Sequence, residues 1–418
     1  MTFLIALMLI AAPPDTLRLA ELQEAALQQD PRTRQLALES DIANLRLDNL
    51  ATRYYPQVAA QGQATVQSDV TSVDIPVPNA STPSPSRDQY QLTLNVDQLI
   101  YDGGATAEQR TLQRIRRDVA QASARAERYR VREQVNQAYF AVLLLQAQQE
   151  QLRILDDDLQ AKRNVIAARV EQGAALPGAL DELDAERITV RQQQATVRAD
   201  RRTALARLGE LTGRPLADDA VLVPPDVPAI QPDRVPRYRP EYAVFDQTKR
   251  QLQQQADMAD VDLKPRVSAF AQGGYGRPGL NRFEDSFQPF GLVGVQLRWT
   301  LWDWGRADRE QEALAAQQRI VDTQEATFSR NLRLAIDGYQ NDIDRLTEAL
   351  RLDRQLIAHR QRIEAQAASQ LDNGVITTAD YLEKRNDVFR ARLQQRLHRL
   401  QRLQTRVQYL TTIGSEHP

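Results

Sequence analysis

An internal duplication limits the possible folds of this sequence more than any other feature. Four segments of the first half return in the second half: Pro31 as Pro240, Pro56-Gln57-Val58 as Pro265-Arg266-Val267, Tyr101-Asp102-Gly103-Gly104 as Trp302-Asp303-Trp304-Gly305, and Gln172-Gly173 as Asn373-Gly374. The first two pairs share one interval, and the last two pairs share a shorter one. A duplication with one shortened loop explains both intervals, with the copies at about residues 15–225 and 239–413.

Short segments flank and separate the two copies. Residues 226–238 are rich in Pro, which has no backbone N–H, so we expect a linker without helix. Residues 414–418 form a tail. Residues 1–14 contain an apolar run of ten residues, FLIALMLIAA, which is too short to cross a bilayer because about 20 residues are needed. We interpret residues 1–14 as a secretory signal peptide, although no Lys or Arg precedes the run. The alternative is a buried N-terminal turn.

Each copy is expected to contain a helix, two strands, a very long helix, a tight turn and a returning helix. The strands, near residues 58–66, 90–96, 267–275 and 293–301, alternate between apolar and polar residues, so each has one apolar and one polar face. In a soluble sandwich the apolar face would pack on a second sheet, whereas in an outer-membrane barrel it contacts lipid. Four strands cannot close a barrel, and open edges are not tolerated in lipid. A membrane-spanning role therefore requires several chains that share one barrel.

Two helices are expected to be unusually long. Ala105 to Gln172 contains no Pro or Gly, and Arg306 to Asn373 contains only Gly338. At about 1.5 Å per residue, each stretch would span roughly 100 Å. Apolar residues recur at alternating spacings of three and four, which indicates narrow coiled-coil seams. The other helices, near 16–52, 179–213, 240–263 and 378–413, are shorter, so we expect a helical cylinder built from continuous and composite rods. No segment reaches 18 consecutive apolar residues, so we expect no transmembrane helix.

Composition argues against several classes of function. The formal net charge of -2 gives no indication of a nucleic-acid partner. The absence of Cys excludes disulfides, thiolate metal sites and a lipid-modified N-terminal Cys. His359, His398 and His417 are scattered, and the sequence has no visible nucleophile–base pair, phosphate loop or metal-ligand cluster. We therefore expect no enzyme activity, no cofactor and no metal site.

Aromatic residues gather where the strands are expected to meet the long helices. All three Trp residues, Trp299, Trp302 and Trp304, fall within six positions, Tyr101 is the counterpart of Trp302, and Tyr54-Tyr55 precede the first strand. Such clustering is typical of the aromatic girdle at a membrane interface. The alternative is a local aromatic core at the junction between strand and helix.

Together these features resemble the outer-membrane efflux protein family of TolC-like channels. The resemblance rests on the duplicated order of elements, the Pro-x-Val strand starts, the Asp-Gly-Gly and Asp-x-Gly strand ends, and the Gly-containing turns of the long hairpins. It covers about residues 15–413. It implies a mostly α fold with a membrane β segment: duplicated long α-helical hairpins form an α-barrel, and four strands per chain contribute to a shared 12-stranded β-barrel of a homotrimer.

The resemblance also implies a function and a set of partners. The chain would be the outer-membrane channel component of a tripartite efflux or type I secretion system, a passive conduit through the outer membrane and periplasm of a Gram-negative bacterium. Its partners would be outer-membrane lipid, a periplasmic adaptor (membrane fusion) protein, and an inner-membrane transporter of the RND, ABC or MFS type.

A candidate pore gate follows from the resemblance. Members such as TolC carry an Asp six positions after the hairpin Gly and a second Asp three positions later, and the matching residues after Gly374 are Asp380 and Glu383. In a trimer they would form stacked carboxylate rings, which favour cations and repel one another. The family's latch positions hold Leu371 and Ile376 and do not match. The alternative is an ordinary solvated face, since acidic residues are common near helix starts.

The hairpin tips, Gly173-Ala174 and Gly374-Val375, resemble the turns on which the family docks its adaptor. A tight turn alone would also place Gly at these positions, so the alternative is a purely structural role.

Two other classes of function compete with a channel. A soluble periplasmic coiled-coil adaptor or scaffold would explain the helices but not the alternating strands with flanking aromatic residues. A structural cell-surface or filament protein would not need hairpins at matching places in both copies. An enzyme is the least favoured class, because the sequence has no catalytic motif.

Overall fold

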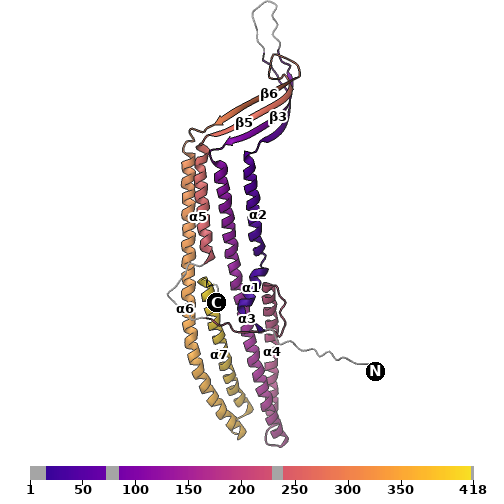
Figure 1. The fold of residues 1–418 in the computed structure, drawn as a ribbon. Coiled ribbons are helices and arrows are strands. Elements are labelled where there is room, and N and C mark those ends of the chain that lie inside the picture. The colour runs from indigo at the N-terminus through magenta and orange to yellow at the C-terminus, as the bar shows by residue number, and fades with distance from the viewer. Residues whose placement is uncertain (1–15, 72–83, 228–238, 416–418) are drawn as a thin grey trace, which may run out of the picture. The chain divides into compact units, whose positions relative to one another are not determined.

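The computed structural model describes residues 16–71, 84–227 and 239–415 (Figure 1). The segment interpreted as a signal peptide, most of the linker and His417 lie outside these residues. The helices are α1 (Leu19–Gln29), α2 (Arg32–Ala51), α3 (Ala105–Glu171), α4 (Pro177–Thr212), α5 (Pro240–Ala259), α6 (Arg306–Asp372) and α7 (Thr378–Thr412), with 3-10 turns η1 (Thr52–Tyr54) and η2 (Asp260–Leu263). The strands are β1 (Thr16–Leu17), β2 (Gln57–Val66), β3 (Asp88–Tyr101), β4 (Val221–Leu222), β5 (Arg266–Arg277) and β6 (Gln288–Arg298).

The predicted order of elements is confirmed in both halves of the chain. Helices α3 and α6 are each 67 residues long, and each is followed by a short turn and a returning helix. Within the described residues, no helix combines the length and apolar character needed to cross a membrane.

The chain forms two compact units, and each draws residues from both halves of the sequence. The first unit is made of Met1–Gln35, Ala122–Ala243 and Glu325–Pro418, and the second of Leu36–Gln121 and Val244–Gln324.

The core of the first unit surrounds a parallel pairing that the sequence analysis missed. Thr16 and Leu17 of β1 pair with Val221 and Leu222 of β4. The Tyr139 hydroxyl, on α3, donates to the Leu17 carbonyl at 2.9 Å. The main apolar cluster around it includes Leu22, Val135, Tyr139, Phe140, Leu208, Val407 and Tyr409, which are fully buried. Strand β1 is therefore fastened to the long helix α3.

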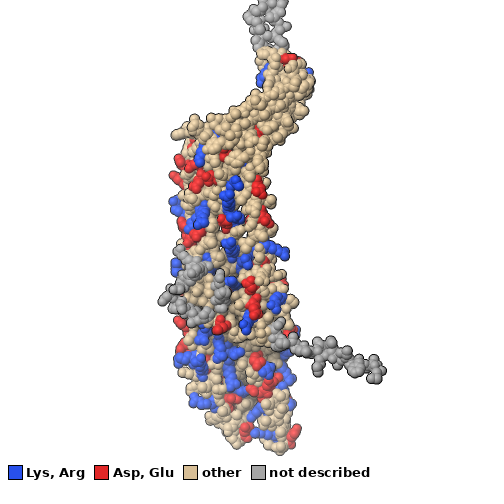
Figure 2. Space-filling model, in the orientation of Figure 1, with Lys and Arg blue, Asp and Glu red and all other residues tan. Residues whose placement is uncertain are grey.

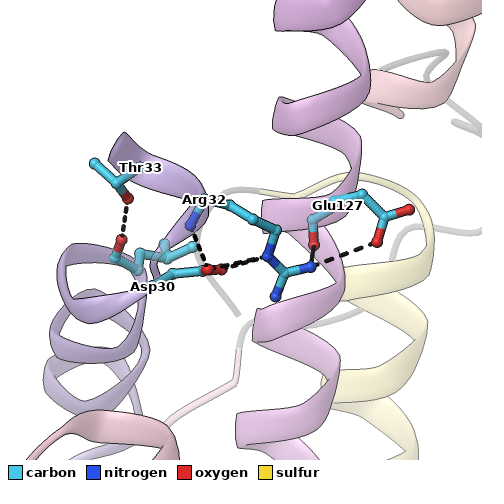
Figure 3. Close-up of polar contacts among 5 residues, drawn as sticks. Asp30, Arg32, Thr33 and Glu127 are labelled. Atoms are coloured by element: carbon cyan, nitrogen blue, oxygen red, sulfur yellow. Dashed lines mark hydrogen bonds and ion pairs between the residues drawn. The ribbon is translucent and has the colours of Figure 1, made fainter. Parts of the chain in front are cut away.

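The prediction of one helix over residues 16–52 is wrong. The segment begins as β1 and is interrupted between α1 and α2, because Pro31 has no N–H to continue the helical hydrogen bonds. The Asp30 carboxylate accepts the backbone N–H of Arg32 at 3.0 Å and its side-chain Nε at 2.9 Å. The same guanidinium donates to the Glu127 carbonyl on α3 at 3.1 Å (Figure 3). The interruption is thus a fixed corner.

A buried Arg joins helix α3 to the start of helix α5 in the first unit. The Arg239 side chain is 8% exposed and donates to Glu241 at 2.6 and 3.0 Å and to Glu133 of α3 at 3.3 Å. Its guanidinium also lies over the Tyr129 ring, 4.8 Å from the centroid. Since a buried charge is stable only when it is paired, these contacts depend on one another.

Replacing Arg239 by Ala should destabilise the protein strongly. The Glu241 side chain is 12% exposed and would be left buried without its partner, so we expect a loss of about 3–5 kcal/mol in the free energy of unfolding. Arg345→Ala is the control, because its pair with Asp342 is exposed on both sides and should contribute less than about 1 kcal/mol. Denaturant unfolding in detergent would measure the loss of stability in both variants. Equal losses would contradict the conclusion that the pairing of Arg239 is a buried, stabilising contact.

The second unit contains an antiparallel sheet with strand order β2-β3-β5-β6 (Figure 1). The two hairpins join through β3 and β5. One strand prediction is wrong at its end, since β6 stops at Arg298 and does not include Trp299 or Leu301. Its partner β5 begins at Arg266 after Pro265, which has no N–H with which to extend the pairing.

Candidate functional site

The four-stranded sheet has one apolar and one polar face, as the alternation predicts. Cross-strand partners share a face, so the register assigns each residue. The apolar face includes Val58, Leu92, Leu94, Val293 and Val295, which are 53–79% exposed. In the view of Figure 2 the sheet carries few charged residues, whereas Lys, Arg, Asp and Glu are interspersed over the helices. An exposed apolar surface of this extent indicates contact with lipid or with another chain.

A β-bulge keeps Tyr101 on the apolar face. Leu99 pairs with Ser268, but the register then shifts, and Tyr101 pairs with Val267 on the apolar face. With unbroken alternation Tyr101 would have followed Leu99 to the polar face, because successive odd positions share a side. The bulge therefore redirects one of the predicted interface residues.

The six aromatic residues predicted for a membrane interface all lie at the junction of strands and helices in the second unit, and none is buried. They are called the aromatic belt below: Tyr54, Tyr55, Tyr101, Trp299, Trp302 and Trp304, with exposures of 40–79%. The Tyr54 hydroxyl bonds Asp102 at 3.2 Å, and the Trp299 indole N–H donates to the Leu263 carbonyl at 3.0 Å. Exposed rings suit a boundary between hydrocarbon and water, and in Tyr54 and Trp299 the polar atom of the side chain is also hydrogen-bonded.

A second aromatic group lies at the opposite ends of β3 and β5 and was missed by the sequence analysis. Phe287 stacks on Tyr90 and on Tyr275, with centroid distances of 6.3 and 5.7 Å. The Arg277 guanidinium lies 5.6 Å from the Phe287 ring and pairs with Asp88. Tyr90 and Tyr275 occupy the apolar face, which the alternation predicted, but Phe287 comes from a loop whose pairing no local pattern reveals.

Both transitions from strand to long helix use the same hydrogen-bonded cap. Asp102 accepts the backbone N–H groups of Gly104 at 3.0 Å and Thr106 at 2.7 Å. Asp303 repeats this with Gly305 at 2.9 Å and Ala307 at 2.8 Å, and these hydrogen bonds hold the pKa of Asp303 below its ordinary value. Each carboxylate satisfies N–H groups that a helix start leaves without partners.

The second cap contains a strained residue. Trp304 has φ 60°, in the left-handed region, where its counterpart in the first copy, Gly103, has φ 70°. A side chain in this region costs on the order of 1 kcal/mol or more, whereas Gly adopts it freely. Trp304 is nevertheless 79% exposed and packs edge-to-face on Trp302 at 6.0 Å.

Comparing Trp304→Gly with Trp304→Ala should isolate this strain. Both variants remove the ring, but only Gly relaxes the backbone, so we expect Trp304→Gly to be more stable than Trp304→Ala by about 1 kcal/mol. Thermal unfolding in detergent would measure the difference. Equal stabilities would mean that the backbone at this position carries no strain.

The hairpin tips are tight turns with exposed apolar side chains, and each contains a Gly whose backbone is in the left-handed region. Gly173 has φ 68° and Gly374 φ 72°, and in both tips the next residue donates its N–H back to a carbonyl of the preceding helix. Ala174 and Val375 are these donors, at 2.7 and 2.8 Å. Val375 is 69% exposed and Leu176, beside the first tip, is 80% exposed.

The candidate gate residues lie on the first turns of α7. Asp380 and Thr377 form a capping box: the Thr377 hydroxyl accepts the Asp380 N–H at 3.2 Å, and the Asp380 carboxylate accepts the Thr377 N–H at 3.0 Å. The hydrogen bonds from the Thr377 side chain and backbone hold the pKa of Asp380 below 3.8. Glu383 is exposed and pairs with Lys384 at 2.8 Å. Asp380 therefore caps the start of α7 within one chain.

The capping box predicts a local response to acid. Because the folded-state pKa of Asp380 is lowered, its contribution to stability is present above about pH 3.8 and is lost as the pH falls through the lowered value. Hydrogen-exchange protection in the first turn of α7 should therefore fall in acid after correction for intrinsic exchange. In Asp380→Asn it should change far less. The first turn of α4, which has no side-chain cap, is the internal control.

Ion pairs join the two helical hairpins near their tips. Asp372 of α6 pairs with Lys162 at 3.1 Å and Arg169 at 3.2 Å, both on α3. Arg385 of α7 pairs with Asp158 of α3 and with Glu364. The unmatched latch positions, Leu371 and Ile376, instead pack in an apolar cluster. The three pairs that link α3 to the second hairpin join residues more than 200 positions apart, so local spacing could not have predicted them.

The comparisons with known proteins decide the family. The profile of the outer membrane efflux proteins matches residues 22–214 and 238–415. The chain belongs to this family. No curated protein sequence matches it.

Solved structures support the fold over nearly the whole chain. The outer membrane protein VceC of Vibrio cholerae is 18% identical, with 95% of this chain and 96% of that chain covered and a TM-score of 0.68. CusC is 15% identical, with coverage of 96% and 93% and a TM-score of 0.71. The open state of the Neisseria gonorrhoeae MtrE outer membrane channel is 14% identical, with coverage of 95% and 89% and a TM-score of 0.67.

Membership of the family determines the broad function. The protein is an outer-membrane efflux channel that extends into the periplasm, and it is not an enzyme. The α-barrel and β-barrel architecture expected from the sequence is confirmed. A soluble adaptor or scaffold is not favoured.

Proposed function

We propose that three copies of this chain form one passive conduit with a shared 12-stranded β-barrel. The observation that carries this proposal is an exposed apolar sheet face in a sheet whose outer strands, β2 and β6, each pair on one side only among the described residues. Backbone groups on such edges need partners in hydrocarbon. Edge β6 of one copy beside edge β2 of the next would satisfy them.

The distance between the aromatic groups supports a membrane-spanning orientation. On strand β3, Tyr90 belongs to the second aromatic group and Tyr101 belongs to the aromatic belt. At about 3.3 Å per residue and a tilt near 45°, this separation corresponds to about 25 Å along the membrane normal. Outer-membrane barrels have an apolar band of about this height between two aromatic girdles. The belt would then lie at the periplasmic interface.

The periplasmic end would carry the gate and the docking surface. Asp380 and Glu383 of three chains would form carboxylate rings that attract cations. The tips Gly173-Ala174 and Gly374-Val375, with exposed Val375, would contact a periplasmic adaptor (membrane fusion) protein. The adaptor would connect the conduit to an inner-membrane transporter of the RND, ABC or MFS type, for efflux or type I secretion. We also propose that residues 1–14 are the signal peptide and that the two repeats cover residues 15–225 and 239–413.

The conduit is tested with the purified protein in planar bilayers. We expect the protein to fractionate with outer membranes, to be a trimer after solubilisation in detergent, and to conduct ions in the bilayer. A water-soluble monomer without conductance would refute the trimeric conduit.

The gate is tested in the same bilayers with Asp380→Ala/Glu383→Ala. Multivalent cations should block the parent, and the double variant should need roughly tenfold more cation for half-block, because adjacent carboxylates bind such ions together. Asp342→Ala/Glu348→Ala is a matched control, since it removes two exposed carboxylates of α6 outside the tips. Unchanged block in the gate variant would remove the gate assignment and leave the conduit intact.

A further inference from the structure

The polar face of the sheet is lined mainly by uncharged amide and hydroxyl groups. Its members include Gln61, Gln63, Gln91, Thr93, Asn95, Gln272 and Gln296. Neighbouring amides bond one another, as Gln272 does with Asn95 at 2.8 Å. In the proposed barrel this face surrounds the water-filled lumen. Apolar or charged residues are the minority on this mainly uncharged face, so we expect specific contacts with a solute at them.

Two Phe residues of the second hairpin break the alternation and lie on this polar face. Phe270 of β5 is directly opposite Gly294 of β6, and Phe290 of β6 is directly opposite Gly274 of β5. Each ring extends over the glycine opposite it: a Cβ at Gly294 would lie 2.6 Å from the Phe270 ring, and one at Gly274 would overlap the Phe290 ring. Each glycine thus leaves space for a ring to lie along the sheet with its other face toward the lumen.

The two rings differ in their neighbours on β3. Phe270 pairs across the strands with Asp97, whereas Gly274, under the Phe290 ring, pairs with Thr93. Directly opposite residues have Cβ atoms about 5 Å apart. The Phe270 ring extends over Gly294 on the side away from β3, and the Asp97 side chain is on the same face of the sheet directly across from Phe270. A ligand could therefore touch both.

The charge of Asp97 is not cancelled by the cations of the same face. Asp97 is exposed, and the cations of this face are Arg266, which pairs with Asp262 at 2.7 Å, and Arg298, its register partner on β6. From Asp97, Arg298 is two strands and four residues away, or about 10 Å across and about 13 Å along the sheet. This separation exceeds the Debye length of about 8 Å at physiological salt. The site therefore presents a local negative charge beside an aromatic face.

We propose that Asp97 and Phe270 form a contact site for organic cations that carry an aromatic ring, inside the barrel lumen. The ammonium group would lie beside the Asp97 carboxylate, and the ligand's ring would pack on Phe270. This site rests on the proposed barrel and is separate from the gate at Asp380 and Glu383. Exposed cation and aromatic contacts are individually weak, which suits a conduit that must release what it binds.

The site is tested by blocking potassium currents with benzyltrimethylammonium and with tetramethylammonium. The measurements use the trimer with Asp380→Ala/Glu383→Ala, so that block at the periplasmic end does not mask block in the barrel. Benzyltrimethylammonium should block at lower concentration than tetramethylammonium. Phe270→Leu keeps an apolar side chain over Gly294 and should weaken block by the benzyl compound about two- to fivefold, with potassium-to-chloride selectivity unchanged.

Two further variants separate the contributions of ring and charge. Asp97→Asn should weaken block by both ammonium ions and lower the preference for potassium over chloride. Phe290→Leu is the matched control, because it removes the same kind of ring from above a glycine without an adjacent carboxylate, and it should change neither property.

Equal effects of Phe270→Leu and Phe290→Leu would overturn the proposal, since the rings would then only cover glycines. Unchanged block and selectivity in Asp97→Asn would overturn it as well. A parent without conductance would refute the conduit and this site together, whereas the other outcomes leave the conduit standing.

Discussion

Backbone N–H and C=O groups at a sheet edge have no water to bond in hydrocarbon, and this constraint governs how the chain must be built. In the part of the chain that the structure describes, four strands provide two paired hairpins but leave β2 and β6 as edges. The side chains of one face, such as Val66 and Val293, are also left exposed in the single chain. The proposed association of copies would meet both demands, because each chain would supply one edge of each kind and a continuous apolar face.

Unpaired backbone groups must also be satisfied at the junctions between strands and helices. Strands β3 and β6 are each followed by a long helix, and the first N–H groups of that helix need acceptors. Asp102 and Asp303 supply them with nearly identical geometry in both copies. The copies differ in the next residue, where Gly103 adopts a positive φ freely and Trp304 does so with strain. Strain retained at an exposed ring suggests that the position of the ring matters more than local stability.

Much of the fold could be predicted because the helices and strands have strong local periods. The two long stretches without Pro form helices α3 and α6, and the four segments of alternating apolar and polar residues form strands β2, β3, β5 and β6. The contacts that local patterns do not encode were missed: β1 with β4, Arg239 with Glu133, and Asp158 with Arg385. The glycines of the hairpin tips could be located because Gly marks turns, and Asp380 and Glu383 were proposed only through the family resemblance. Phe270 and Asp97 become neighbours only through the register of two separate hairpins.

The distribution of charge along the chain is consistent with passive transport of varied solutes. A lumen of amides exchanges hydrogen bonds with water at little net cost, so it does not hold a solute by charge. Asp97 and Arg298 are separated by more than a Debye length, so they act as isolated weak contacts and do not neutralise each other. The carboxylates Asp380 and Glu383 lie instead on one helix face, where rings from three chains would reinforce one another. Strong selection at the periplasmic end and weak contacts in the barrel would let solutes enter under control and leave freely.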